Sequence, residues 1–419
     1  MCDEAFARPQ PCPGPCDGSG PAVSPDDGPP DGADPLRWLL EVSHTLPPPE
    51  LGRAVGQAMA GLGATATCLF LVDHDHRRMH PLGPDVGEQD PVDIDTTVAG
   101  RAFAWERTHT AKIDDGVRLW VPMIDGTARL GVVAVDLPDD TVDDDVVLAV
   151  EEVAALAAVL VITKGHYTDT IEHVRRHREM TLAAELQRSS LPPVALVTAE
   201  VAVAGMLQPA YEVAGDSFDY ALDRDGMHVV VIDSVGHDLD SSLISHLVQG
   251  SLRNSRRNGL DIAEAYSVAD EALAAMYSDQ RFATAAFGRL ELESGRFRWI
   301  AAGHPPPLLV RSGRVVGEAP AVPALPIGLR GGTPPVNEVV LERGDALLFY
   351  TDGVTEGGAR GGERFGLDRL VDLLGRTLLS GMPPAELLRR LVAAVLEHTA
   401  YELHDDTTLV LVQRRDGTA

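Results

Sequence analysis

Two aspartates in the segment 213–251 have a spacing that could bring their carboxylates together. Asp216 lies in one β-rich run and Asp233 ends the next, and the turn between the runs contains Asp223 and Gly226. If these two turn residues pair, counting outward along both strands places Asp216 opposite Asp233, and a bulge would shift this register by about one residue. Opposed side chains lie roughly 5 Å apart. Such a pair of carboxylates needs either a cation between its members or a proton held by one of them.

Three further aspartates stand at the ends of other β-rich runs. Asp352 follows one apolar run, and Asp405 and Asp406 directly precede another. Each of them could equally be a cap or turn residue, but strand ends at one edge of a sheet can converge, and loops there carry functional sites. Together with the opposed pair they would form an oxygen-only donor set, which suits Mg²⁺ or Mn²⁺ better than Zn²⁺. Two such ions a few ångströms apart can share one water as a nucleophile.

Motifs for other common chemistries are missing from the sequence. There is no G-x-S-x-G elbow, no G-x-x-x-x-G-K-[ST] loop and no G-x-G-x-x-G after a strand. The turn at 223–226 lacks the ligand series and the terminal Glu of an EF-hand. His237 and His304 are polar residues at strand ends. His304 could reach the site, although a role in a structural turn is favoured.

The composition limits the size, the partners and the compartment. A chain of 419 residues with 44% hydrophobic residues is large enough for two or three domains. Its net charge of −28 argues against a nucleic-acid partner. Three cysteines lie in the Pro/Gly-rich start and Cys68 in an apolar run, which favours reduced thiols. Because no long apolar run and no signal-peptide pattern occurs, we expect a cytoplasmic protein without a membrane span.

Residues 1–33 are rich in Pro, Gly and Asp and predict a disordered tail. Residues 34–162 have the pattern of a small domain with helices at both ends of an antiparallel sheet. A capping box from Thr141 to Asp144 is expected to start the last helix. The expected helices are 36–42, 51–62 and 146–162, and the expected strands are 66–72, 119–124 and 130–135.

This pattern resembles a GAF domain, a sensor unit. The resemblance lies in the strand 68–72, the segment 97–103, the strands around 121–123 and 131–135, and the closing helix. It implies a domain that binds a small molecule or mediates dimerisation, and no residue identifies the ligand.

Three histidines, at positions 74, 76 and 80, follow the first strand of this domain. A metal site is one interpretation, and a solvated hairpin tip is the favoured one.

Residues 163–193 predict a connector helix that stops at two consecutive prolines, Pro192 and Pro193. Its apolar positions form one narrow stripe, interrupted by His177 and Arg178. The helix is therefore expected to pair with a second copy as a short coiled coil, to dock on the next domain, or to serve as a plain connector.

Residues 199–414 alternate short β-rich runs with two blocks of helices, which predicts an α+β sandwich with helices packed outside. The expected strands are 200–207, 213–222, 227–233, 282–292, 296–301, 307–310, 337–341, 346–350 and 407–413, and the expected helices are 238–257, 262–278, 367–379 and 384–398.

This second domain resembles the metal-dependent protein phosphatases of the PPM (protein phosphatase 2C-like) family, in their bacterial SpoIIE/RsbU-like branch. Seven stretches match in the order of the family. They are LQRSSLP at 186–192, VAGDSFD at 213–219, DSVGH at 233–237, AAGHPP at 301–306, LPIG at 325–328, YTDGVTE at 350–356 and DDTTL at 405–409. Seven ordered matches are far more specific than one short motif.

The resemblance implies an αββα sandwich with two Mn²⁺ or Mg²⁺ ions, and hydrolysis of phosphoserine or phosphothreonine by a water that bridges the ions. Carried over residue by residue, the metal ligands are Asp216, Asp233, Gly236 through a backbone carbonyl at or near it, Asp352 and Asp405. Asp219 would support the ligands, and Asp406 fits less well as a direct ligand. Asp238 and Ser217 depart from the family pattern, whereas every implied carboxylate ligand is present.

The function implied is that of a protein serine/threonine phosphatase controlled by an N-terminal sensor domain. Relatives in this branch often act on an anti-sigma factor antagonist, so the expected partner is a phosphorylated regulatory protein. A homodimer is expected, in which the connector transmits the dimer geometry to the active site. The alternative is a catalytically silent scaffold that docks a regulatory partner. Silent members lose metal carboxylates, and this chain keeps them.

Overall fold

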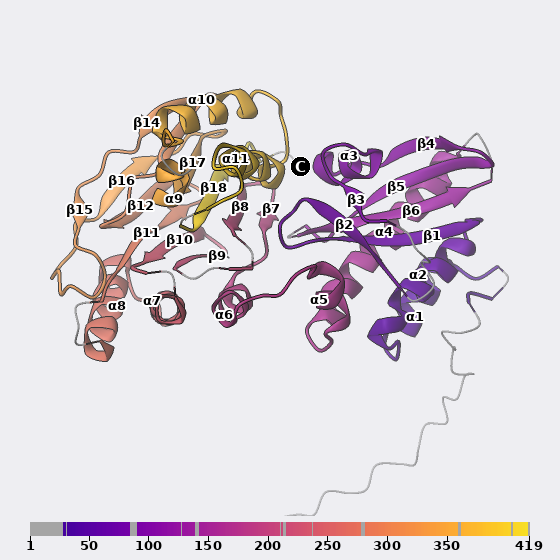
Figure 1. Cartoon of the computed structure of the whole chain (residues 1–419), viewed down its shortest axis with the longest axis horizontal. Coiled ribbons are helices and arrows are strands. Elements are labelled where there is room, and N and C mark those ends of the chain that lie inside the picture. Colours follow the sequence, from indigo (N-terminus) through magenta and orange to yellow (C-terminus); the bar gives the residue numbers. More distant parts are fainter. Residues whose placement is uncertain are drawn as a thin grey trace, which may run out of the picture.

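The computed structural model describes residues 28–30, 32–83, 90–126, 128–138, 142–209, 211–212, 215–236, 238–277, 281–358, 362–403 and 405–417. Within these residues the chain forms three six-stranded sheets, one in its N-terminal half and two stacked in its C-terminal half (Figure 1). The predicted tail falls almost wholly outside the described residues.

The N-terminal domain, from α1 to α4, is one sheet with helices on both faces. Its strand order is β3-β2-β1-β6-β5-β4. The central strand β1 is apolar along its length because both of its faces are covered: Leu69 and Leu71 pack with α1, α2 and α4, and Phe70 packs with α3. The elements are α1 (Pro35–Ser43), α2 (Leu51–Ala60), β1 (Ala66–Val72), β2 (Arg78–Leu82), β3 (Val92–Asp93), α3 (Val98–Trp105), β4 (His109–Ile113), β5 (Gly116–Ile124), β6 (Arg129–Leu137) and α4 (Asp144–Gly165).

Two local predictions for this domain were wrong. The N-cap of α4 is Asp143, whose carboxylate accepts the Asp145 N–H at 3.0 Å, so the helix does not begin at a box headed by Thr141, which lies outside the described residues. The histidines after β1 are not a solvated tip, because His74 is 2% exposed and His76 is 6% exposed. His74 lies 2.9 Å from Glu172 of the connector and against Tyr211 of the C-terminal half, and sequence periodicity carries no information about such contacts.

The connector is not one continuous helix. It consists of the end of α4 and two short helices. Helix α4 runs on to Gly165, and two short helices follow it, α5 (Thr170–Arg175) and α6 (Leu182–Ser190). The expected apolar stripe does not share one face, since Ile171 is buried while Tyr167 and Leu182 are 67% and 63% exposed. Of the alternatives left open, α6 docks on the next domain, where its Leu186 carbonyl lies 2.9 Å from the Nε2 atom of His246.

The C-terminal domain is a sandwich of two sheets with helices outside each. One sheet has the order β15-β12-β11-β10-β9, with β16 also on β12, and the other has the order β14-β13-β17-β18-β8-β7. Alternating strand residues such as Phe218, Trp299 and Phe349 fill the space between the sheets. Helices α7 and α8 cover the first sheet, and α10 and α11 cover the second (Figure 1). This is the αββα arrangement that the sequence predicts.

The boundaries of these elements fall close to the predicted runs, and the short elements β7, β14, β15 and α9 are additional. The strands are β7 (Ala195–Val197), β8 (Val201–Gln208), β9 (Asp216–Leu222), β10 (Gly226–Ser234), β11 (Ala283–Glu291), β12 (Arg296–Ala302), β13 (Leu308–Arg311), β14 (Arg314–Glu318), β15 (Pro323–Ala324), β16 (Asn337–Val340), β17 (Ala346–Tyr350) and β18 (Thr407–Arg414). The helices are α7 (Leu239–Arg257), α8 (Ile262–Met276), α9 (Asp352–Glu356), α10 (Leu367–Leu378) and α11 (Pro384–His398).

Candidate metal centre

The hairpin of β9 and β10 places two carboxylates directly opposite each other. Its turn closes with the Asp223 N–H donating to the Gly226 carbonyl at 2.8 Å. The register then runs without a bulge to the far end, where Asp216 is the partner of Asp233. The pairing expected from counting along the sequence is therefore confirmed.

The second sheet brings its own acidic strand ends to the same place. Strands β17 and β18 are antiparallel neighbours, so the end of β17 and the start of β18 meet at one edge. Asp352 follows β17, and Asp405 and Asp406 precede β18. The Oδ2 atom of Asp406 accepts the N–H groups of Gly215 and Asp216 at 2.8 and 2.9 Å, which ties this edge to the start of β9.

Close backbone contact holds this edge together. At Gly353, a Cβ atom would lie 1.9 Å from the carbonyl oxygen of Asp406, so a larger residue would push the two strand ends apart. Glycine after Asp352 is therefore a requirement of the fold at this point.

Asp216 is buried and hydrogen-bonded by hydroxyls. Its Oδ2 atom accepts from Thr351 at 2.8 Å and from Thr408 at 2.6 Å, and the residue is 2% exposed. Burial raises the pKa of Asp216 well above its usual range, and the neighbouring charges of Asp406 and Asp233 raise it further. The two hydroxyls favour the charged form but do not outweigh these effects.

The other carboxylates repel one another as well. Burial is the largest cause that raises the pKa of Asp233 to about 7, followed by the charges of Asp352, Asp405 and Asp406. Burial and then the charge of Asp405 also raise the pKa of Asp352. A divalent cation among these oxygens would relieve the repulsion, and an oxygen-only donor set fits Mg²⁺ or Mn²⁺.

The remaining predicted ligand is a backbone group. Gly236 follows β10 with φ of +105°, a conformation that glycine adopts without strain. Its carbonyl oxygen lies 2.9 Å from the position that a Cβ atom on Gly215 would take, so the two loops are in contact. His237, Val213 and Ala214 of the matched motifs lie outside the described residues. Asp238, a departure from the family pattern, is the N-cap of α7 and forms a capping box with Ser241.

His304 is a structural residue beside the centre. It is 5% exposed, and it connects two strands, since Nδ1 lies 3.0 Å from the Thr284 hydroxyl and Nε2 lies 3.1 Å from the Tyr350 carbonyl. Burial lowers the pKa of His304 to about 4, so the ring is neutral at physiological pH. The role favoured from the sequence, a structural one, agrees with this geometry.

Asp219 does not support the ligands, contrary to the expectation. It lies three residues after Asp216 and so projects from the opposite face of β9, toward α7. There it accepts from the Arg253 guanidinium at 2.8 and 2.9 Å, with Arg256 at 3.4 Å. Its part is to attach α7 to the sheet. The motif alone does not reveal this, because the arginines lie far along the chain.

Sequence reasoning missed three polar residues that position the centre. Thr351 and Thr408 hold the Asp216 carboxylate, and the Gln187 side chain donates through Nε2 to the Asp216 carbonyl oxygen. All three lie inside the matched stretches at 186–192, 350–356 and 405–409. Their position in these matched stretches could have identified them as site residues, but only the acidic residues of the stretches were considered.

Comparison with known proteins agrees with this arrangement. Residues 223–415 match the family model described as "Stage II sporulation protein E (SpoIIE)". Over 240 residues the chain is 20% identical to "Phosphoserine phosphatase RsbU" of Bacillus subtilis, covering 57% of this chain and 70% of the relative. It is 25% identical over 136 residues to "Phosphoserine phosphatase RsbP" of the same organism, covering 31% of this chain and 34% of the relative.

Among solved structures, the RsbU and RsbW domains of Rv1364c from Mycobacterium tuberculosis match at 30% identity with a TM-score of 0.48. That match covers 54% of this chain and 63% of the other. The family match includes Asp233, Asp352 and Asp405 and begins just after Asp216. Over residues 223–415 the chain is therefore similar to SpoIIE-type domains, and its relatives include proteins named as phosphoserine phosphatases.

Proposed function

We propose that the protein is a metal-dependent protein serine/threonine phosphatase. One observation carries the proposal: four carboxylates far apart in the sequence, Asp216, Asp233, Asp352 and Asp405, gather at the edge of the sandwich. Burial and then the charges of neighbouring carboxylates raise the pKa of the first three. A fold keeps such a repulsive cluster where a cation compensates it.

The donor set fits two Mn²⁺ or Mg²⁺ ions. Asp233 and Asp216 would hold them from the first sheet, with a backbone carbonyl near Gly236, and Asp352 and Asp405 would hold them from the second. When bound, the ions supply Lewis-acid activation of water and neutralise charge on the phosphoryl group. In an acidic protein, they also make the site acceptable to an anionic substrate.

The chain's own residues fix the positions of these donors. Thr351 and Thr408 orient the Asp216 carboxylate, and Asp406 holds the backbone of the same residue. Because each contact links one sheet to the other, the distance between the two halves of the centre is set by the packing of the sandwich. Precise placement of this kind is a large part of phosphoryl-transfer catalysis.

The substrate class follows from the family resemblance. A phosphorylated regulatory protein, of the kind called an anti-sigma factor antagonist, is the proposed substrate. The names of two relatives, both phosphoserine phosphatases, support a phosphoserine substrate. The chain covers only 34% of RsbP, so this assignment concerns the phosphatase domain and not the signal that each protein senses.

The N-terminal domain is proposed to be a GAF-like sensor that binds a small molecule and forms a homodimer in the cytoplasm. Helix α4 supports the dimer, since Leu148 and Val159 on its outer face are 55% and 44% exposed. Among the described helices, α4 alone is long and apolar enough to cross a membrane. Its other face packs into the core of the domain, through Val150, Val153 and Val161, which is typical of a core helix.

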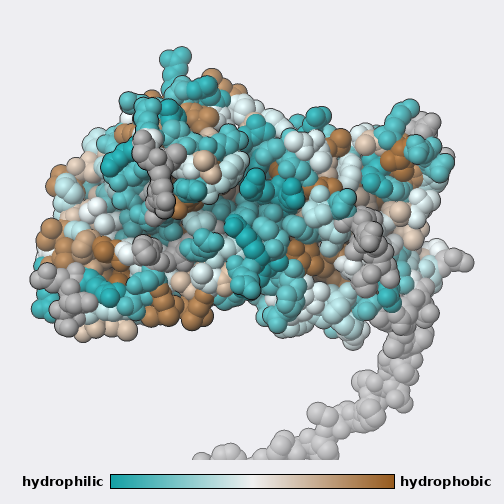
Figure 2. All heavy atoms as spheres, viewed as in Figure 1, coloured by the Kyte–Doolittle hydropathy of each residue, from teal (hydrophilic) through white to brown (hydrophobic). Residues whose placement is uncertain are grey.

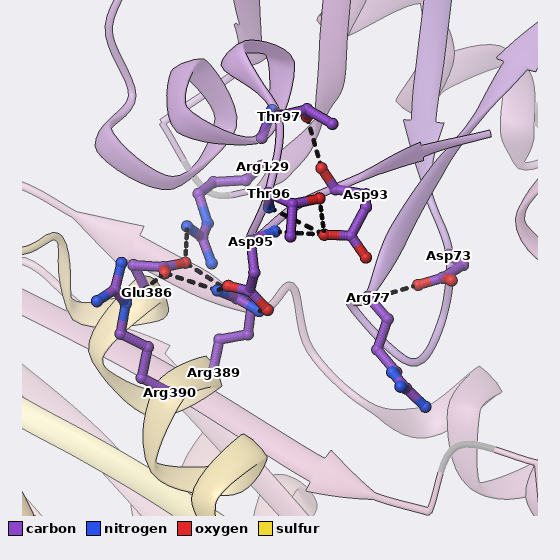
Figure 3. Close-up of polar contacts among 11 residues, drawn as sticks. Asp73, Arg77, Asp93, Asp95, Thr96, Thr97, Arg129, Glu386, Arg389 and Arg390 are labelled. Atoms are coloured by element: carbon purple, nitrogen blue, oxygen red, sulfur yellow. Dashed lines mark hydrogen bonds and ion pairs between the residues drawn. The ribbon is translucent and has the colours of Figure 1, made fainter. Parts of the chain in front are cut away.

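Two contacts between the halves could carry a signal to the centre. The first is α6, whose Gln187 bonds the backbone of Asp216. The second is a buried ionic cluster between the N-terminal domain and α11, drawn in Figure 3: Glu386 binds Arg129 at 3.2 Å and Arg389 at 2.9 Å, and Arg389 reaches Asp95. Figure 2 shows hydrophilic residues gathered over this junction, as expected for a contact made by charged groups.

Hydrolysis of p-nitrophenyl phosphate and of a phosphoserine protein in Mn²⁺ tests the proposal. We expect Asp352→Ala to abolish turnover, and Asp368→Ala, an exposed aspartate on α10, to leave it unchanged. Equal activity of wild type and Asp352→Ala would make the catalytic assignment wrong. Calorimetry that detects neither Mn²⁺ nor Mg²⁺ binding would instead favour the silent scaffold.

A further inference from the structure

A second group of metal-ligating side chains lies outside the carboxylate centre, where the N-terminal domain meets the connector. It contains Asp73 just after β1, His80 in β2, and His177 between α5 and α6. One donor atom from each residue lies within 4.8 Å of the other two. Two protein segments, a hairpin and the connector, therefore converge on one point.

The donor atoms have the spacing of a metal site and not of hydrogen bonds. The Nε2 atom of His80 and the Nδ1 atom of His177 each lie 3.8 Å from the same oxygen, Asp73 Oδ2. That distance is too long for a hydrogen bond. The Nε2 atom of His80 is buried and has no hydrogen-bond partner among the residues that the structure describes. The two imidazole rings lie nearly parallel, with centroids 5.8 Å apart.

The groups around these donors orient them. The backbone N–H groups of Arg77 and Arg78 donate to Asp73 Oδ1 and Oδ2 at 2.9 and 3.2 Å, which fixes the carboxylate, and Figure 3 shows the first of these bonds. The Nε2 atom of His177 lies 3.3 Å from Asp75 Oδ2. A carboxylate on one ring nitrogen holds the proton there and leaves the other nitrogen free to bind a metal, as in many zinc sites.

In the structure, the other ring nitrogen of His177 is in contact with the Tyr211 hydroxyl, and this hydroxyl has a second hydrogen-bond acceptor close by. The hydroxyl lies 2.9 Å from His177 Nδ1 and 3.3 Å from the Arg175 carbonyl oxygen. If a metal took Nδ1, the hydroxyl could donate to the carbonyl without leaving its position. No buried polar group would be stranded by the exchange.

We propose that Asp73, His80 and His177 bind one Zn²⁺ ion. Two imidazoles and one carboxylate are a donor set that Zn²⁺ accepts, with a fourth position left for water. Tetrahedral ligands on Zn²⁺ lie roughly 3.4 Å apart, so the two 3.8 Å distances to Asp73 must shorten by a few tenths of an ångström. The distance between the two histidine nitrogens, which is within 4.8 Å, must shorten by at most about 1.4 Å. His177 and Asp75 line a cleft of about 610 Å³ between the two halves, which gives the ion a route from solvent.

The nearby cations do not oppose this assignment. Arg178 pairs with Asp75 at 3.1 Å, and the Nε of Arg175 donates to the Val72 carbonyl at 3.0 Å. The carboxylates of Asp73 and Asp75 add negative charge to the donor set, and negative charge favours a divalent cation there.

The bound ion would join the β1–β2 hairpin to the joint between α5 and α6. Helix α6 carries Gln187 to the Asp216 backbone, so the ion would set the position of a segment that touches the catalytic centre. This consequence rests on the proposed function, whereas binding of the ion does not.

Titration with Co²⁺ and Zn²⁺ tests the site in the full chain with any affinity tag removed. An Asp233→Asn, Asp352→Asn background weakens the carboxylate centre as a competing site. Co²⁺ on imidazole ligands absorbs visible light, so binding is followed without any phosphatase assay. We expect one Co²⁺ per chain, displaced by Zn²⁺, and loss of that absorption in His177→Ala.

Two further variants sharpen the result. Asp75→Asn is expected to weaken Zn²⁺ binding by about 10- to 100-fold, the usual effect of losing a carboxylate that orients a ligand. His173→Ala, an exposed histidine at the end of α5, should bind as tightly as the parent. The proposal is overturned if His177→Ala keeps the stoichiometry and affinity of the parent, or if the parent takes up no Co²⁺ at neutral pH.

Discussion

Removing one charge from the carboxylate centre should stabilise the metal-free protein while it destroys metal binding. In Asp233→Asn the side chain keeps its shape and loses its negative charge. Burial raises the pKa of Asp233, and the charges of Asp352, Asp405 and Asp406 raise it further. Without a cation, the neutral amide is therefore the better residue at this position.

The size of the effect follows from the pKa of Asp233. A rise of this pKa from 3.8 to about 7 corresponds to a loss of about 4 kcal/mol of folding stability at pH values above 7. Asp233 is half-buried, and solvent screening reduces the expected gain to about 2 kcal/mol. The folded state binds the Asp233 proton more tightly than the unfolded state does. The contribution of Asp233 to the stability of the wild type is therefore complete below pH 3.8 and is lost as the pH rises to about 7. Asp233→Asn should therefore have a larger free energy of unfolding than wild type at pH 8 and the same free energy of unfolding at pH 4.

Urea unfolding in EDTA, at both pH values, measures the difference, with Asp368→Asn as the control for an exposed aspartate. Addition of Mn²⁺ should reverse the order, since the wild type gains stability from ion binding and the variant gains little. A variant that is less stable than wild type at pH 8 in EDTA would refute the reasoning. So would a gain of the same size at pH 4.

Three other substitutions test the roles of residues around the centre. Asp219→Asn should cost about 2–4 kcal/mol in urea unfolding, because the Arg253 guanidinium loses its carboxylate and keeps only its bond to the Ser190 carbonyl. The Mn²⁺ affinity measured by calorimetry should stay within about twofold of wild type, and a large loss of affinity would return Asp219 to the metal centre. Gln187→Ala removes a buried hydrogen bond and should cost about 1–3 kcal/mol in urea unfolding. It should also lower kcat about tenfold, and an unchanged kcat would mean that α6 does not position Asp216. Glu386→Gln should cost about 3–5 kcal/mol, because it leaves buried guanidinium groups without their shared anion; a cost below about 1 kcal/mol would contradict the importance of this cluster.

The sequence predicts most of the sandwich because its strands carry strong local signals. The turn from Asp223 to Gly226 fixes the register of β9 and β10, so the pairing of Asp216 with Asp233 follows from counting alone. A short edge strand such as β14 (Arg314–Glu318) lacks such a signal, because three of its five residues are exposed and none is buried. The connector was predicted as one helix because its residues favour helix locally. In the structure it contacts both domains and is divided into separate helices.

What the sequence by itself determined was the chemistry available: which residues are carboxylates, which strands they end, and which family the motifs resemble. Only the tertiary structure decided how these residues combine. It placed Asp219 with Arg253 and not with the metal ligands, because helix α7 packs against that face of β9. It also buried His74 and brought His177 to Asp73 and His80. Contacts between segments about 100 residues apart depend on how whole elements pack, and no local pattern encodes them.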